Sequence, residues 1–142
     1  MLADLQVNFL GVLVAGIATM AVGFLWYSPF LFGKLWVAAS GLTEAQIAEC
    51  KKKKMVSTYA IGFVNGLVMS AVLGVLMNLV LVENVVDSVI LTGLVWLGFV
   101  LTLMIGGILW EGKKPKLVMI NAGYYLVTLL VSGLVQYFFL NL

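Results

Sequence analysis

Histidine and arginine are absent from this sequence of 142 residues, and cysteine occurs once, at Cys50. A single cysteine excludes an intrachain disulfide and any metal or redox motif built from several cysteines. It also has no histidine to act as the base that a catalytic thiol needs. We therefore expect neither an enzyme nor a metal or cofactor site.

Charge is scarce as well, and its positions indicate a membrane protein. Only 10% of the residues are charged and 63% are hydrophobic, whereas soluble domains carry about 25% charged residues. The uncharged stretches each exceed the ~20 residues with which a helix crosses a hydrocarbon core. They are residues 5–33, 55–82, 88–110 and 117–142. The sequence predicts an all-α fold, an integral membrane antiparallel bundle of four transmembrane helices in a single domain, 1–142. The expected spans are about 5–27, 57–82, 85–110 and 117–140.

The first span does not resemble a signal peptide. Its leading segment contains Asp4 in place of basic residues, and its apolar run ends in Trp26-Tyr27-Ser28-Pro29. Signal peptides have a basic start, a shorter apolar core and a small-residue cleavage site. We expect this span to be retained in the mature protein.

The positive charges are all lysines, and they occupy only two of the three connections between spans. They are Lys34 and Lys51 to Lys54 in the first, and Lys113, Lys114 and Lys116 in the third. Lysine-rich short loops stay in the cytoplasm. We therefore expect a multi-pass protein of the cell (inner) membrane. Residues 28–56 and 111–116 should be cytoplasmic and both termini external.

The first connection, residues 28–54, begins with a dense aromatic segment. Pro29 disfavours a helical conformation at Ser28, so the first span should end near Tyr27. Tryptophan and tyrosine prefer the headgroup boundary, and Lys34 can reach the headgroups along an apolar stem. We expect a surface-lying or re-entrant plate; the alternative is a plain membrane anchor. The candidate functional connector consists of Trp26, Tyr27, Ser28, Pro29, Phe32, Gly33, Lys34 and Trp36.

A short interfacial helix should follow in the same connection. Thr43 and Gln46 have the spacing of a capping box, and the helix should run to Lys51, Lys52, Lys53 and Lys54. Each lysine near anionic headgroups contributes about 1 kcal/mol. We expect anionic headgroups at the cytoplasmic face of the bilayer as partners, and no nucleic acid. A simple anchor and a lipid-regulated switch both fit these lysines.

Small residues recur every four positions along the spans. Span 2 carries the longest such ridge, in Gly62, Gly66, Ser70 and Gly74, and span 3 has Gly98, Thr102 and Gly106. Membrane helices associate through close packing at small residues. We expect the ridge of span 2 to pack helices and, together with span 1, to support a homo-oligomer.

No Asp, Glu, His or Lys lies deep within the expected spans, since Asp87 stands at the outer start of the third, although proton and cation coupling usually depends on such a residue. Polar groups are present there, and the candidate polar cavity consists of Asn65, Asn121, Tyr124, Thr128 and Ser132. The alternative is that these residues only form hydrogen bonds between helices, worth about 0.6 kcal/mol each. Glu111, beside Trp110 and Lys113, is either a salt-bridged interface residue or part of a site.

The aromatic segment Trp26-Tyr27-Ser28-Pro29-Phe30-Leu31-Phe32-Gly33-Lys34-Leu35-Trp36 resembles a known family. The resemblance extends through Gly41 to Glu44, Trp96 to Phe99 and Asn121 to Tyr125, and so covers nearly the whole chain. The family consists of small four-helix membrane proteins catalogued as domain of unknown function 1761. The resemblance implies the four-helix fold and no particular activity.

Two hypotheses for function follow. The polar face of span 4 favours a homo-oligomeric channel or carrier for a small neutral solute. The packing ridges favour an accessory or structural membrane protein that packs against partner helices.

The expected topology gives a first testable prediction. Cys50 should be cytoplasmic, so a membrane-impermeant maleimide should label it in permeabilised cells and not in intact cells. A cysteine added after Leu142 in a Cys50→Ser background is the matched control and should be labelled in intact cells. Rapid labelling of Cys50 from outside would contradict the orientation drawn from the lysines.

Overall fold

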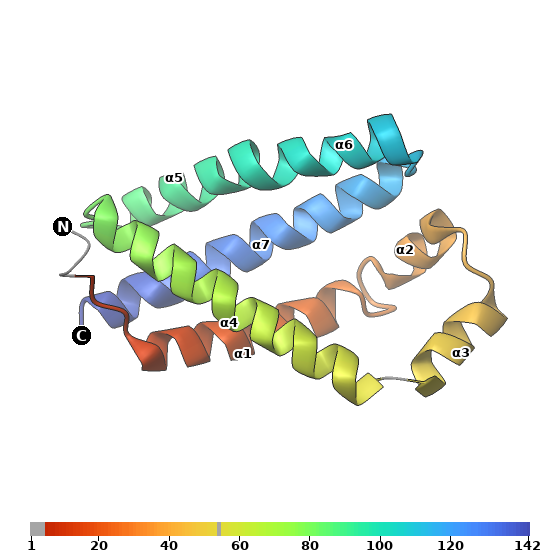
Figure 1. Ribbon diagram of the computed structural model, residues 1–142, viewed down its shortest axis with the longest axis horizontal. Helices are drawn as coiled ribbons and strands as arrows, with labels where there is room; N and C mark the ends of the chain where they lie inside the picture. The colour runs from red at the N-terminus through yellow and green to blue at the C-terminus, as the bar shows by residue number, and fades with distance from the viewer. Residues whose placement is uncertain (1–4, 54) are drawn as a thin grey trace.

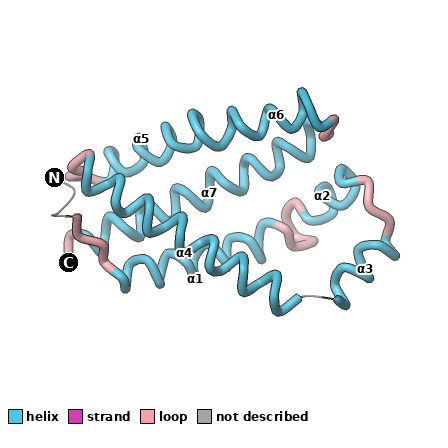
Figure 2. Tube along the Cα trace, viewed as in Figure 1, coloured by secondary structure: helices cyan, strands magenta, loops and turns pink. Residues whose placement is uncertain are grey.

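The computed structural model describes residues 5–53 and 55–142 and is helical almost throughout (Figure 1). Figure 2 shows that the loops are confined to the connections and the chain ends. The helices are α1 (Phe9–Trp26), α2 (Gly33–Ser40), α3 (Glu44–Lys53), α4 (Met55–Leu79), α5 (Val85–Val95), the π-helix η2 (Trp96–Leu101), α6 (Thr102–Glu111) and α7 (Pro115–Leu140).

Four of these segments are long and apolar enough to cross a membrane, as the sequence predicts. They are Phe9–Trp26, Met55–Leu79, Val85–Glu111 and Pro115–Leu140. The first begins four residues later than expected, because Asn8 caps α1 by accepting a hydrogen bond from the Gly11 N–H at 3.1 Å. A cap of this kind satisfies a backbone donor that the first turn leaves unpaired.

Successive spans run antiparallel (Figure 1), and the second and third connections are short turns. Asn84 caps α5 by accepting from the Asp87 N–H at 3.0 Å, and Gly112 ends α6 with φ of +66°. Pro115 then opens α7 at a position where a missing N–H has no cost. The described ends of the chain lie at one end of the bundle, and both lysine-bearing connections lie at the other (Figure 1).

The first connection differs from the expected plate followed by one helix. It contains two short helices, because the aromatic segment itself continues as α2. The capping box at the start of α3 is confirmed: the Thr43 N–H donates to Gln46 Oε1 at 2.9 Å, and the Gln46 N–H donates to Thr43 Oγ1 at 3.2 Å. Lys54 lies outside the described residues.

Helix α7 is the centre of the bundle and packs against α1, α4 and α5. Figure 1 shows it between the α5–α6 segment and the pair formed by α1 and α4. An apolar cluster at the end near the termini joins Leu73 and Met77 of α4 to Leu129 of α7. The third span depends on α7 for most of its contacts.

A buried glutamine fixes the junction of three helices. The Gln136 side chain, fully buried on α7, donates through Nε2 to Ser70 Oγ at 2.8 Å. Two glycines make room for it, since a Cβ at either Gly11 of α1 or Gly74 of α4 would lie 3.2 Å from Gln136 Oε1. The close approach of α1, α4 and α7 therefore depends on small residues facing one polar side chain.

The small residues of span 2 pack against other helices of the same subunit. A Cβ at Gly66 would lie 2.7 Å from Thr19 Oγ1 of α1, and Ser70 is fully buried. At Gly62, in contrast, the nearest such contact is Met20 Sδ at 3.9 Å. The expected oligomer interface on spans 1 and 2 was wrong for this part of the ridge, because the chain's own helices cover it from Gly66 to Gly74.

The third span uses its small residues differently. Gly98 and Thr102 are exposed, and a Cβ at Gly98 would meet nothing within 4 Å. Their segment includes the π-helix η2, a geometry that proteins adopt rarely. The ridge at Gly98 and Thr102 therefore faces away from the bundle.

Replacement of Gly66 by Leu should destabilise the folded subunit, because the new side chain collides with Thr19. Overpacking of this kind costs about 1–3 kcal/mol. The midpoint of thermal unfolding in mild detergent should fall by several degrees. Gly62→Leu is the matched control and should leave the midpoint close to that of the wild type. Equal midpoints for both variants would show that α1 and α4 do not approach as closely as described.

Candidate functional site

The aromatic connector folds back on the end of α1 through backbone hydrogen bonds. The Phe32 N–H donates to Trp26 O and the Gly33 N–H donates to Ser28 O, both at 3.0 Å. Gly33 is buried, and a Cβ there would lie 2.7 Å from Ser28 O. Glycine is therefore required at this position for close backbone approach, as the sequence suggested.

The connector is tied to the start of α7 by side-chain donors. Trp26 Nε1 donates to Ile120 O at 3.1 Å, and the Tyr27 hydroxyl donates to Asn121 Oδ1 at 2.8 Å. These two side chains are half-buried against the bundle and do not project freely from its surface. The reason is that α7 offers hydrogen-bond acceptors at this depth.

A third donor binds the same part of α7 from the opposite side. Trp96 Nε1, at the start of η2, donates to Ala122 O at 2.8 Å. Consecutive residues of α7 thus accept hydrogen bonds from the first and third spans. Sequence reasoning did not anticipate Trp96 in this role, although its indole was the one strong donor in the middle of span 3.

Tyrosines cluster beside these bonds. The ring of Tyr27 lies 5.2 Å from that of Tyr124, and Tyr124 lies 5.1 Å from Tyr125. Tyr27 follows the last residue of the first span, and burial, followed by the neighbouring Tyr125 and Tyr124, raises its pKa well above the usual range. The Tyr27 phenol therefore keeps its proton and donates to Asn121 at any physiological pH.

A cleft opens between α1, α4 and α7 at the end that carries the lysines, and it consists of three adjoining cavities. The outer cavity of about 320 Å³ is lined by Tyr27, Pro29, Gly33, Lys34, Val37 and Lys51. The middle cavity of about 490 Å³ is lined by Met20, Gly23, Phe24, Tyr27, Lys51, Thr58, Tyr59 and Tyr124. The inner cavity of about 40 Å³ is lined by Thr19, Met20, Gly62, Asn65, Gly66, Met69, Tyr124, Tyr125 and Thr128.

The cleft narrows toward the middle of the bundle. Tyr27 and Lys51 are shared by the outer and middle cavities, while Met20 and Tyr124 are shared by the middle and inner ones. The inner cavity, of about 40 Å³, has room for about three water molecules, since a single water needs about 10–15 Å³ of such space. The cleft is thus wide and aromatic at its mouth and narrow and polar at its end.

Beyond the inner cavity the polar side chains of α7 are buried. Ser132 and Gln136, the next two polar residues on the same face of α7, are fully buried. Ser132 Oγ and Gln136 Oε1 have no hydrogen-bond partner among the described residues. The polar face of α7 therefore continues past the cleft among fully buried residues.

The five residues of the predicted polar cavity do not form one site. Asn65, Tyr124 and Thr128 line the inner cavity together, as the sequence suggested. Ser132 is buried below it, and Asn121 lies on the other side of Tyr27. The Thr128 hydroxyl donates to Tyr124 O and Tyr125 O at 3.0 Å, the local bonding that threonine often makes within a helix.

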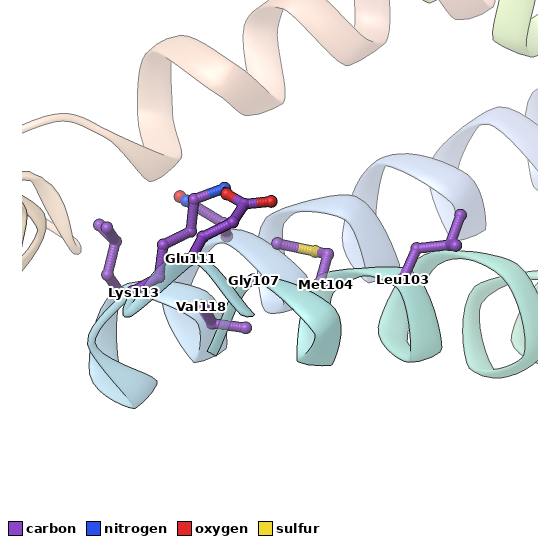
Figure 3. Close-up of a pocket in the computed structure, with 8 residues that line it drawn as sticks. Leu103, Met104, Gly107, Glu111, Lys113 and Val118 are labelled. Carbon is purple, nitrogen blue, oxygen red and sulfur yellow. The ribbon is translucent and has the colours of Figure 1, made fainter. Parts of the chain in front are cut away.

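Asn121 lines a separate cavity of about 250 Å³ between α6 and α7 (Figure 3). Glu111 and Lys113 stand at one end of it and Leu103 at the other. Lys113 Nζ lies 2.6 Å from Glu111 Oε2, and both side chains are more than half exposed. Glu111 is therefore salt-bridged to Lys113, and it also lines this cavity.

The lysines of the first connection have separate positions. Lys51 faces the outer and middle cavities, whereas Lys52 is exposed and lines neither. The lysines expected to bind headgroups as one group, Lys51 to Lys54, thus differ in position: of Lys51 and Lys52, only Lys51 faces the cavities. The sequence did not predict that Lys51 faces the cavities or that the Tyr59 ring packs 5.2 Å from that of Phe24. Both contacts depend on how α3 and α4 are placed in the bundle.

Water access to the cleft is testable, because replacing Cys50 by Ser leaves a chain without cysteine. In that background, Asn65→Cys should react with a small hydrophilic thiol reagent about tenfold or more faster than Val64→Cys or Val68→Cys, since thiols react as thiolates, which water favours. Val64 and Val68 are exposed on the same helix. Equal rates at all three positions would mean that the cleft is closed to water.

Comparison with known proteins identifies the family to which the chain belongs. No curated protein and no solved structure gave a match. The family model DUF1761, described as a protein of unknown function, matches residues 10–137. This range includes all four candidate spans nearly in full, together with the connector and the cleft. The chain, a small protein with four candidate membrane spans, belongs to the DUF1761 family of proteins of unknown function.

Proposed function

We propose that this protein is a carrier for a small neutral solute, with the cleft between α1, α4 and α7 as its binding site. The observation that carries the proposal is the shape of the cleft. It is open at the lysine-bearing end and ends in the inner cavity at Asn65 and Thr128, with fully buried residues beyond. From the distribution of lysines, the open end faces the cytoplasm.

A carrier accounts for this shape better than a channel does. A channel needs a continuous path, whereas Leu73, Met77 and Gln136 fill the far half of the bundle. Carriers expose a binding site near the middle of the membrane to one side at a time, by rocking or gating of helices. The cleft corresponds to the state that is open toward the lysines.

The chemistry of the cleft favours a neutral solute. Its inner cavity offers an amide at Asn65 and hydroxyl groups at Thr19, Tyr124 and Thr128. No carboxylate or lysine lines the inner cavity among the described residues. An ion bound at this depth would be left without a counter-charge, which is costly in a membrane interior. Small molecules with amide or hydroxyl groups match these donors and acceptors.

The second candidate function is that of an accessory membrane protein, and the third span favours it. Among the described residues of α5, η2 and α6, only Ser88, Thr92 and Gly107 are buried. The outward ridge at Gly98 and Thr102 allows close approach of another helix. That helix would belong to a partner protein or, in the homo-oligomeric version of the carrier, to a second copy.

Reconstituted vesicles test the carrier. Stopped-flow light scattering should show faster swelling in urea or glycerol when the purified protein is present. Asn65→Leu should lower that rate at least to half, because the bulkier apolar side chain removes the amide of the inner cavity. Val64→Leu, at the neighbouring exposed position that does not line the inner cavity, is the control and should leave the rate unchanged.

The outcomes separate the two functions. Swelling equal to that of protein-free vesicles for these solutes and for a wider set of neutral amides and polyols would contradict the carrier. Equal rates for Asn65→Leu and the wild type would contradict the assignment of the cleft as the binding site.

A further inference from the structure

We infer that the mouth of the cleft is a binding site for one anionic phospholipid, with its phosphate between Lys34 and Lys51 and an acyl chain in the middle cavity. Membrane lysines commonly act as diffuse anchors. In this site, by contrast, two lysines that are far apart in the sequence bind one phosphate, and the lysines next to them in the sequence do not contact it.

Two positive charges meet at the outer cavity. Lys34 comes from α2 and Lys51 from α3, and both line the same space of about 320 Å³. No carboxylate is among the described residues that line the outer or the middle cavity. An anionic group placed there would neutralise two ammonium groups that have no carboxylate across the cavity. A phosphate fits, because lysine binds it as a point charge.

An apolar chamber adjoins the charged one. The middle cavity shares Tyr27 and Lys51 with the outer cavity, and its walls include Met20, Phe24 and Tyr59. The Phe24 and Tyr59 rings lie 5.2 Å apart at a tilt of 56°. A ligand that occupies both chambers therefore has a charged head and an apolar tail in contact with it.

The position of the two chambers selects a lipid over a soluble phosphate compound. They lie where α1 ends and the connector begins, at the depth where aromatic side chains and snorkelling lysines mark the headgroup boundary. Phe24 is 55% exposed on the outside of the bundle, so the middle cavity has a rim that faces lipid. A phospholipid at this boundary reaches the cavity with its phosphate already at the height of the lysines.

A lipid in this place would cover the entrance to the inner cavity, which shares Met20 and Tyr124 with the middle one. Anionic lipid would then regulate access of solute to the cleft. This consequence rests on the proposed function, whereas the binding of the lipid does not. Binding is therefore measured without transport.

The experiment measures retention of phosphatidylglycerol by native mass spectrometry. Delipidated full-length protein is titrated with this lipid in a zwitterionic detergent. The double variant Lys34→Gln with Lys51→Gln should weaken the Kd by about 30-fold, the contribution expected of two lysines at a headgroup. Lys52→Gln with Lys114→Gln removes the same net charge from exposed positions outside both cavities, and should change the Kd by less than about twofold.

Each other outcome would overturn the inference. Equal weakening by the two double variants would show that the lysines act only as diffuse charge, and no weakening by either would place the lipid elsewhere. Competition by glycerol 3-phosphate as strong as that by the lipid would identify a soluble phosphate ligand. Thermal unfolding of both double variants should match the wild type, since all four lysines are exposed.

Discussion

The contact of Gln136 with α1 and α4 is the constraint on which the shape of the bundle depends. One amide, buried between Gly11 and Gly74 and bound to Ser70, draws three helices together near the termini. In a membrane the association of helices relies on such close packing and on polar bonds, because lipid is as apolar as the side chains. Toward the other end α4 has no comparable partner, and Val56 and Ile61 are 85% and 70% exposed. The cleft exists because α4 is joined to α7 at one end only.

The aromatic donors give the other end its form without closing it. Trp26 and Tyr27 hold α1 against α7, and Trp96 holds the third span there. Each bond satisfies a polar group in an environment where an unpaired one is costly. None of the three reaches α4. The result is a bundle in which α1 and α7 stay together while α4 diverges.

The sequence predicted the architecture well because it depends on length and charge, which are local properties. The four spans, the capping box at Thr43 and the separation of lysines from termini all follow from runs of residues. The candidate site was predicted only in part. The repeat of four along α7 placed Thr128 and Ser132 on one face, yet the repeat alone does not indicate where the neighbouring helix diverges. The cleft therefore includes the first of these and not the second.

The same limit explains the residues that were missed. Lys51 and Lys52 are equivalent as members of a charged run, and only the placement of α3 distinguishes them. Gly66 and Gly98 belong to similar ridges, but α1 covers the first and nothing in the described chain covers the second. A packing motif in a sequence predicts that a helix will approach closely; which helix does so depends on the arrangement of the bundle.

The central place of α7 has a consequence for how the protein is made. Spans enter the membrane in sequence order, and α1 and α4 can pack on each other as soon as both are present. The third span has few contacts with them, since it packs mainly on α7. Until α7 emerges, Ser88 and Thr92 face lipid and the glycines at positions 11 and 74 have nothing to enclose. Synthesis of α7 thus converts the first three spans into a packed bundle in a single late step. Before that step the chain lacks the helix against which the other spans pack.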